Sequence, residues 1–371
     1  MRKILFIFGT RPEAIKLCPV IDRLRQEPAE FAVRICVSAQ HRDLLDQVLG
    51  VFGVKPDYDL NAMQARQTLF QSTSRILREL EGVFEAERPD WVMVQGDTTT
   101  TLCGALAGFY GRVKVAHVEA GLRTGDPEEP FPEEMNRVLT SRLASLHFAT
   151  TSWAQENLIR EGFPTDRISV TGNTGIDAVL RISRLLENGA VPSPAWPWLD
   201  DGRRLILVTA HRRESFGTGF LQICRALSTL AERDDVQIVY PVHPNPNVAE
   251  PVRLALSGLK NVILLDPLDY TSFVDLMRRS SILLTDSGGV QEEGPSLGKP
   301  VLVMRKKTER PEAVTAGTAR LVGSDPERIV EEVRVLLEDE AEYGRRSRIH
   351  NPYGDGEASQ RIAARLKAEL R

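Results

Sequence analysis

The stretch that decides the fold lies near the N-terminus, where residues 4–16 read ILFIFGTRPEAIK. Ile4–Phe8 is an apolar run of the length of one buried strand, Gly9–Thr10 follows as a turn, and Pro12 suits the first turn of a helix. A strand without polar alternation that passes through a short turn into a helix is typical of a parallel α/β sheet. These residues therefore predict an α/β fold.

The same alternation of apolar runs and helical stretches continues along the chain. It predicts two doubly wound domains with parallel sheets, because βαβ units place helices on both faces of such sheets. The expected strands of the first half are 4–8, 33–37, 91–95, 113–118, 147–150 and 168–170, and those of the second half are 205–208, 237–242, 262–265, 282–284 and 301–304.

A segment between these halves breaks the pattern. Residues 188–202 contain Pro192, Pro194 and Pro197 with few periodic apolar side chains, which indicates a linker or domain edge. We therefore expect an N-terminal Rossmann-like domain over 1–178 and a C-terminal one over 200–350. The last segment, 351–371, is expected to be a helix that crosses back to the first domain.

Composition bounds the class of protein. The 371 residues are 42% hydrophobic and 26% charged with a formal net charge of −4, so there is no basic footprint for nucleic acid. The N-terminal apolar run, Ile4–Phe8, is too short for a membrane span. The four cysteines, Cys18, Cys36, Cys103 and Cys224, have no paired spacing, which favours buried thiols in a reducing compartment. We expect a cytoplasmic protein that binds no nucleic acid and no membrane.

Ligands of open parallel sheets bind beyond the carboxyl ends of the strands, so the residues that follow each apolar run are candidate site residues. In the first half these include Arg11 and Lys16, Asp97, and Glu119, and a later helix start carries Glu133 and Arg137. Plainer interpretations remain open, since Asp97 suits a helix N-cap and Glu133 and Arg137, four apart, suit a surface ion pair.

The second half has a similar set of strand-end residues. His211 and His243 each follow a strand, and Thr285-Asp286-Ser287-Gly288-Gly289 leads from a strand through glycines into a helix. Such a turn lets backbone amides approach a diphosphate closely. Glu293 suits either the hydroxyls of a ribose or an ordinary position in the helix.

Two common nucleotide fingerprints are missing. No G-x-G-x-x-G follows the first strand, and Gly298-Lys299-Pro300 lacks the upstream glycine and the Ser/Thr of a P-loop. The sequence therefore does not support an ATPase or a dinucleotide-binding enzyme, and no cofactor is expected.

The motifs taken together carry a resemblance. In chain order they are G-T-R-P-E, G-D-T-T-T, H-V-E-A-G-L-R, P-E-E-M-N-R, H-R-R-E-S, T-D-S-G-G-V-Q-E-E and T-E-R-P-E. The chain resembles the non-hydrolysing UDP-N-acetylglucosamine 2-epimerases over nearly its whole length. The resemblance implies a glycosyltransferase-B type architecture with two Rossmann-like domains facing a cleft, a UDP-sugar as substrate, no metal, and a homodimer.

Site residues follow from the resemblance by motif. The implied catalytic set is Asp97, Glu119, Glu133, Arg137 and His211. The implied substrate-binding set is Arg11, Lys16, Arg212, Leu268, Phe273, Ser287, Gly288, Gly289, Glu293 and Arg310, where Leu268 departs in side chain from relatives with a polar residue. A second UDP-GlcNAc as activator is implied at Gln40, Asp43, Arg66 and His243, with Glu133 and Arg212 shared.

The activator site is weakened in this chain, because Asp43 stands where activator-binding relatives often carry Gln. A carboxylate there loses an amide donor and repels a diphosphate. A plainer interpretation is that residues 40–42 only open a helix.

The expected reaction is reversible C2 epimerisation of UDP-GlcNAc to UDP-ManNAc. The C2 hydrogen and the anomeric oxygen of the α-gluco sugar are trans-diaxial, so anti elimination of UDP gives a 2-acetamidoglucal, and re-addition with protonation on the other face gives the manno epimer. Such a cycle needs acid–base groups on both faces and a cationic clamp for UDP. Which carboxylate serves which face stays open.

Three alternatives remain open. They are a 2-epimerase of a related diacetamido or uronic UDP-sugar, a glycosyltransferase-B type transferase, and a non-catalytic nucleotide-sugar sensor. A transferase needs an acceptor site, for which no signature is present, and the retained acidic positions disfavour the sensor.

Overall fold

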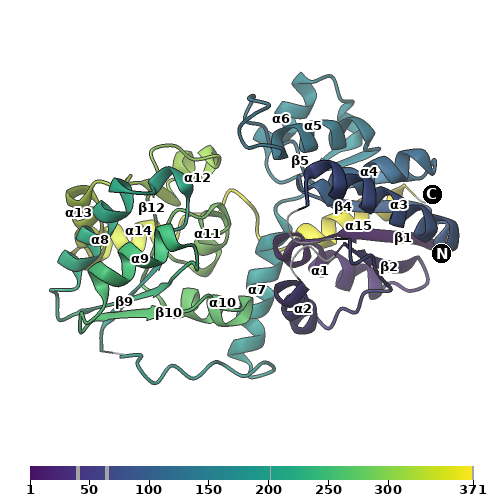
Figure 1. The fold of residues 1–371 in the computed structure, drawn as a ribbon. Coiled ribbons are helices and arrows are strands. Elements are labelled where there is room, and N and C mark those ends of the chain that lie inside the picture. The colour runs from purple at the N-terminus through teal and green to yellow at the C-terminus, as the bar shows by residue number, and fades with distance from the viewer. Residues whose placement is uncertain (39–41, 63–66, 201, 370–371) are drawn as a thin grey trace. The chain divides into compact units, whose positions relative to one another are not determined.

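The computed structural model describes residues 1–38, 42–62, 67–200 and 202–369. The chain divides into two compact units, Met1–Ala178 with Tyr353–Arg371, and Val179–Pro352. Figure 1 shows the return of the chain, because α15 (Ala358–Ala368), drawn in yellow, packs against the purple α1 (Arg11–Arg25) of the first unit.

The described part of the first unit holds a seven-stranded parallel sheet in the order β3-β2-β1-β4-β5-β6-β7. Its strands are β1 (Arg2–Phe8), β2 (Phe31–Val37), β3 (Tyr58–Asp59), β4 (Trp91–Gln95), β5 (Lys114–Ala120), β6 (Leu146–Ala149) and β7 (Ile168–Val170). The other helices of this unit are α2 (Arg42–Val51), α3 (Leu69–Glu87), α4 (Thr99–Tyr110), α5 (Glu133–Leu143), α6 (Ser152–Arg160) and η1 (Thr165–Arg167), and α7 (Thr174–Glu187) leads into the second unit.

The second unit repeats the design with a six-stranded parallel sheet, in the order β10-β9-β8-β11-β12-β13 among the described residues. The strands are β8 (Arg204–Thr209), β9 (Val236–Pro241), β10 (Val262–Leu265), β11 (Ile282–Thr285), β12 (Val301–Val303) and β13 (Ala319–Leu321). The helices are η2 (Arg213–Ser215), α8 (Thr218–Leu230), α9 (Pro246–Leu256), α10 (Tyr270–Arg279), α11 (Gly288–Glu293), η3 (Gly294–Leu297), α12 (Pro311–Ala316), α13 (Pro326–Glu338) and α14 (Glu340–Ser347).

The strand order of each sheet reverses at one point. In the first unit the reversal lies between the neighbours β1 and β4, and in the second between β8 and β11. At such a switch point the connections leave to opposite faces of the sheet, which opens a crevice at the carboxyl ends of the two central strands. These strand ends carry most of the residues that the sequence singles out.

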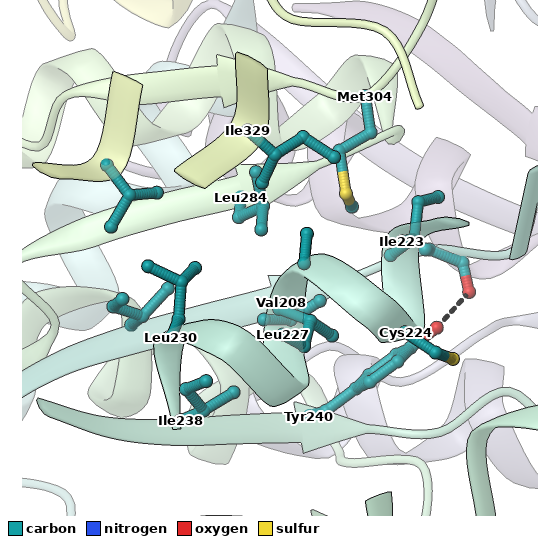
Figure 2. Close-up of a cluster of buried hydrophobic side chains, with 14 of the residues drawn as sticks. Val208, Ile223, Cys224, Leu227, Leu230, Ile238, Tyr240, Leu284, Met304 and Ile329 are labelled. Carbon is teal, nitrogen blue, oxygen red and sulfur yellow. Dashed lines mark hydrogen bonds between the residues drawn. The ribbon is translucent and has the colours of Figure 1, made fainter. Parts of the chain in front are cut away.

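An apolar core supports the second sheet (Figure 2). Ile223, Leu227 and Leu230 of α8 pack towards Val208 and Ile238 of the sheet, and all five side chains are buried. Burying a side chain of this size contributes about 1.5–3 kcal/mol, which fixes the helix on the strands. The strand ends beyond this core are therefore rigidly placed.

The predicted strands are present with ends that differ by up to about two residues from the prediction, and β3 and β13 were not predicted. β3 and β13 are two and three residues long, too short to give a readable apolar run. In the first unit β5 extends to Ala120, beyond the expected end at Val118, because the register with β6 shifts between Val118 and Ala120. The four cysteines are buried and free, in agreement with the sequence.

Candidate active site

The turn after β1 is organised by a buried carboxylate. Glu13 Oε2 accepts hydrogen bonds from the backbone amides of Gly9 (3.1 Å) and Thr10 (2.7 Å), and Oε1 accepts from the hydroxyls of Thr98 (2.8 Å) and Thr101 (3.0 Å). Burial raises the pKa of Glu13, against the lowering effect of hydrogen bonds with the side chains of Thr10 and Thr98 and with the amides of Gly9 and Thr10. Because Glu13 already occupies two amides of the turn, a bound anion here would be met by the side chains of Arg11 and Lys16.

Position 9 requires glycine because the turn has no room for a Cβ atom. A Cβ on Gly9 would stand 2.0 Å from Ser38 Oγ and 2.8 Å from Thr100 Oγ1, well inside contact distance. Those two hydroxyls are themselves hydrogen bonded at 2.7 Å, so neither moves freely. The turn is thereby pressed against the start of α4, beside the Asp97 segment.

Glu119 lies at the end of β5 in a strained backbone conformation. Its φ of 63° falls in the left-handed region, and it sits at the register shift between β5 and β6. A non-glycine residue in this region costs about 1–3 kcal/mol, and such residues cluster at functional sites. Its carboxylate Oε2 accepts from Gln95 Nε2 at 2.5 Å and forms an ion pair with Lys16 Nζ.

Asp97 follows β4 and faces helix α5. Its Oδ2 accepts from Arg137 Nη2 at 2.5 Å, and its backbone carbonyl accepts from Asn136 Nδ2 at 2.9 Å. The N-cap of α4 is Thr98, whose hydroxyl accepts from the Thr101 amide, so the plainer interpretation of Asp97 as a cap does not hold. Burial raises the pKa of Asp97, against the lowering effect of Arg137, and the negative Glu133 raises it further.

The spacing of four residues predicted an ion pair between Arg137 and Glu133, but Arg137 has other partners in the structure. Its guanidinium bonds to Asp97 and lies 3.2 Å from Glu134 Oε2, three residues earlier on α5. Glu134 is buried, and its other oxygen accepts hydrogen bonds from the amides of Thr124 and Gly125. Glu133 instead lies close enough to Asp97 to influence its titration, at the first turn of the same helix.

A neutral histidine lies behind the Asp97 turn. His117 of β5 is fully buried, and its Nε2 donates to the Gly96 carbonyl at 2.7 Å, since a carbonyl can only accept. Burial lowers the pKa of His117 to about 3, so the ring is uncharged at neutral pH. Gly96 itself has a φ of 72°, so this bond supports the backbone that carries Asp97.

In the second unit, the buried Asp286 organises the strand ends. Its Oδ2 accepts from the backbone amides of His211 (2.6 Å) and Arg212 (2.7 Å), and its Oδ1 lies 3.3 Å from His211 Nδ1. The His211 ring stacks on His243 with centroids 5.6 Å apart and an interplanar angle of 19°. Burial lowers the pKa of His211, and Asp286 raises it.

The glycine-rich turn after β11 carries an arginine. Ser287 precedes α11, and Gly288 and Gly289 are its first residues. A Cβ built on Gly288 would have Arg310 Nη2 as its nearest neighbour at 3.7 Å, so the guanidinium covers this end of the helix. Arg310 forms an ion pair with the buried Glu292, while Glu293 ends the helix half-buried.

The remaining predicted residues divide into two groups. Leu268 lies between β10 and α10, and Phe273 lies in the first half of α10; both are half-buried. Gln40 and Arg66 lie outside the described residues, and so does the side chain of Asp43, although its backbone belongs to α2. Of the expected activator residues, the description therefore covers His243, Glu133 and Arg212.

Each unit thus assembles one part of the predicted chemistry. The first unit brings Asp97, Glu119, Arg137 and Lys16 to the carboxyl ends of β1, β4 and β5, and the second brings His211, Arg212 and the Gly288 turn to those of β8 and β11. Within the described ranges, no group of three or more His, Cys, Asp and Glu residues could hold a metal ion. No helix of that part of the chain is long and apolar enough to span a membrane.

Four residues of these arrangements were not picked out as site residues from the sequence: Glu13, Gln95, His117 and Asp286. Three of them stand inside the quoted motifs, next to residues that were chosen. Their role is to hold a neighbour, through contacts with residues far away in the sequence. Only a polar residue in an otherwise apolar strand, such as His117 or Gln95, gave a local signal.

Two doubly wound units, one with a carboxylate cluster and the other with a glycine-rich turn beside an arginine, define a two-domain Rossmann-like α/β protein. The family model for UDP-N-acetylglucosamine 2-epimerase matches residues 22–367, and the chain belongs to this family.

Curated relatives are similar over almost the whole chain. The UDP-N-acetylglucosamine 2-epimerase of Escherichia coli strain K12 is 56% identical, covering 98% of this chain and 98% of its own length. That of Salmonella typhimurium is 55% identical, covering 99% of this chain and 98% of its own.

Solved structures agree in fold. The UDP-GlcNAc 2-epimerase of Neisseria meningitidis bound to UDP-GlcNAc has a TM-score of 0.90 and 48% identity, covering 98% of this chain and 99% of that one. The Methanocaldococcus jannaschii enzyme in complex with UDP-GlcNAc and UDP has a TM-score of 0.81 and 35% identity, covering 99% of both chains. The fold is therefore glycosyltransferase-B-like, as the resemblance implied.

Proposed function

We propose that this chain interconverts UDP-GlcNAc and UDP-ManNAc by anti elimination of UDP, a 2-acetamidoglucal intermediate and re-addition. The family and the near-complete coverage of relatives with that name support the reaction. The observation that carries the mechanism is Glu119, held in a strained conformation between a cation and an amide donor. A carboxylate so constrained is suited to proton transfer at a defined position.

The first unit would supply the acid–base groups. Asp97, Glu119 and Glu133 are our candidates, with Arg137 orienting Asp97 through its hydrogen bond. The raised pKa of Asp97 brings it closer to neutral pH, where a carboxyl group exchanges protons most effectively.

The second unit would hold and release the UDP group. Ser287, Gly288, Gly289 and Arg310 would meet the diphosphate. Glu293 would meet the ribose, and Leu268 and Phe273 would meet the base. His211 and Arg212 would meet the negative charge that develops as UDP leaves C1, since preorganised donors at developing charge lower the barrier. Arg11 and Lys16 would add positive charge from the first unit.

Further proposals rest on family membership and on the sequence patterns described above. They are a homodimer, a cytoplasmic location, and a second UDP-GlcNAc as activator that uses Gln40, Arg66 and His243. We also retain the proposed division of the sequence into 1–178, 200–350 and a C-terminal helix over 351–371.

The decisive experiment follows hydrogen at C2. The purified protein is incubated in D2O with UDP-GlcNAc, without added NAD or metal, and the products are read by proton NMR. We expect UDP-ManNAc to form with deuterium at C2 in both epimers. Epimerisation with the original hydrogen retained would reject elimination, and exchange seen only with a diacetamido or uronic UDP-sugar would change the substrate.

A further inference from the structure

Asp286 and His211 meet at the point where the strand order of the second sheet reverses. Asp286 follows β11, His211 follows β8, and the two strands are neighbours. The Asp286 side chain is fully buried, and one of its oxygens accepts two successive backbone amides, those of His211 and Arg212, at 2.6 and 2.7 Å. The carboxylate is thereby locked in place beside the imidazole ring.

The second oxygen faces the ring itself. Asp286 Oδ1 lies 3.3 Å from His211 Nδ1, an electrostatic contact, and among the described residues this buried oxygen has no hydrogen-bond partner. A buried carboxylate oxygen favours a proton donor as its neighbour. The tautomer with the proton on Nδ1 supplies that donor, because an unprotonated Nδ1 would place two lone pairs against each other.

We propose that Asp286 is a positioning residue for His211. Asp286 keeps the imidazole proton on Nδ1, so that Nε2 is the nitrogen that faces the ligand. This inference rests on the proposed function, in which His211 meets the departing diphosphate. His211 Nδ1 keeps its proton throughout the reaction, while Nε2 gains and then loses a proton. Asp286 forms no covalent bond in the process. The His211 side chain is 39% exposed, so a ligand can reach it.

The charged groups around the ring are few and oppose one another. Asp286 favours the imidazolium, whereas burial, Arg212 and the stacked His243 disfavour it. Asp286 is the anion in this set, so its loss removes the stabilisation of the charged ring. The uncharged form with the wrong tautomer would then prevail.

The test is Asp286→Asn in the whole protein. The amide oxygen can still accept from the two backbone amides, but the NH2 group then faces Nδ1 and donates to it, so the ring proton must move to Nε2. With ¹⁵N-histidine and His211→Ala for assignment, NMR of ligand-free protein reports the tautomer directly. We expect Nδ1–H in the wild type and Nε2–H in Asp286→Asn.

Kinetics give the second readout. We expect kcat to fall on the order of 10²-fold or more with KM little changed, as when a histidine loses its working tautomer. In a His211→Ala background, the added Asp286→Asn change should cost little more. Asp275→Asn is the matched control: Asp275 is also fully buried and bonds Trp196 and Arg279, and its change should leave the His211 tautomer unaltered.

The outcomes separate the two ideas. Nε2–H in the wild type, an unchanged tautomer in Asp286→Asn, or unchanged kcat after the tautomer switches each overturns the positioning role. The wild-type measurement stands even if the variant fails to fold. Absence of C2 exchange in the wild type rejects the proposed function instead, and it is read on a different sample from the ligand-free spectrum.

Discussion

The Glu119 carboxylate is held by Lys16, which lies on the first helix of the chain while Glu119 ends the fifth strand. Both side chains are mostly buried, at 16% exposed for Lys16 and 7% for Glu119. The pair connects the strand ends on either side of β4, where Asp97 begins the neighbouring loop. Lys16 and Glu119 are thus linked through side chains that the sequence places far apart, and the charge of Lys16 also acts against burial to lower the pKa of Asp97.

We expect Lys16→Met to weaken both stability and turnover. Removing the cation leaves a largely buried carboxylate without its counter-charge, which costs about 3 kcal/mol. Urea unfolding measures this loss, and the D2O exchange assay measures turnover. Glu119→Gln, which keeps the hydrogen-bonding shape, should retain more stability yet lose at least about 10²-fold in exchange. Exchange at the wild-type rate in Glu119→Gln would remove Glu119 from the catalytic set.

Arg137→Gln should move the acid limb of the pH–rate profile to higher pH. Arg137 lowers the pKa of Asp97, so its removal leaves burial and Glu133 to raise that pKa further. A carboxylate that must be ionised loses activity as pH falls through its pKa, and a higher pKa brings that loss at higher pH. Arg142→Gln, in the last turn of the same helix and stacked on Phe163, is the control and should leave the limb in place.

His117 and His147 should make the protein lose stability in acid. Burial lowers their pKa values to about 3 and about 4, below the unfolded value near 6.5. The unfolded chain therefore binds more protons as pH falls below 6.5, and each histidine lowers the free energy of unfolding by about 1.4 kcal/mol per pH unit down to its folded pKa.

His147→Phe should flatten this pH dependence, because the ring would still pack on Phe163 without a proton to bind. Denaturant unfolding at several pH values between 4 and 7, on the order of one unit apart, measures the slope. His350→Gln, at an exposed position, serves as the control. A slope in His147→Phe equal to that of the wild type would contradict the assignment.

Gly288→Ala should weaken UDP binding without harming the fold. The added Cβ meets only Arg310 at ordinary contact distance, so any loss must come from a ligand that approaches the backbone. We expect at least about a tenfold rise in Kd for UDP by calorimetry. Gly294→Ala is the opposite control, because its Cβ would lie 2.5 Å from Leu283 Cδ1 and should cost about 1–3 kcal/mol of stability. If Gly288→Ala binds UDP with the affinity of the wild type, the diphosphate does not bind at the Gly288 turn.

Activation by a second substrate should be present but weak. Starting from pure UDP-ManNAc, we expect a lag that a trace of UDP-GlcNAc abolishes, and Asp43→Gln should steepen the response. An effector shifts a conformational equilibrium only by its differential affinity, so weaker binding gives a smaller rate change. Linear progress from time zero in both proteins would reject the second site.

The sequence alone determined the two α/β units and most of their strands, because an apolar run between a turn and a helix is a local pattern. It also placed Asp97, His211 and the Gly288 turn at strand ends, since these residues directly follow such runs. The sequence did not predict the short strands β3 and β13, because two or three residues are too few to show a hydrophobic periodicity. Nor did it predict the extension of β5, since the shift at Glu119 depends on pairing with β6.

Only the tertiary structure decided which side chains meet. The ion pair of Arg137 with Asp97 and the approach of Asp286 to His211 depend on the order of strands in the sheets. That order is set by how each connection crosses the sheet, and the sheet brings together strand ends that are distant in the chain. Local propensity can therefore predict where a strand ends, while the neighbour across the switch point follows from the packing of the whole unit.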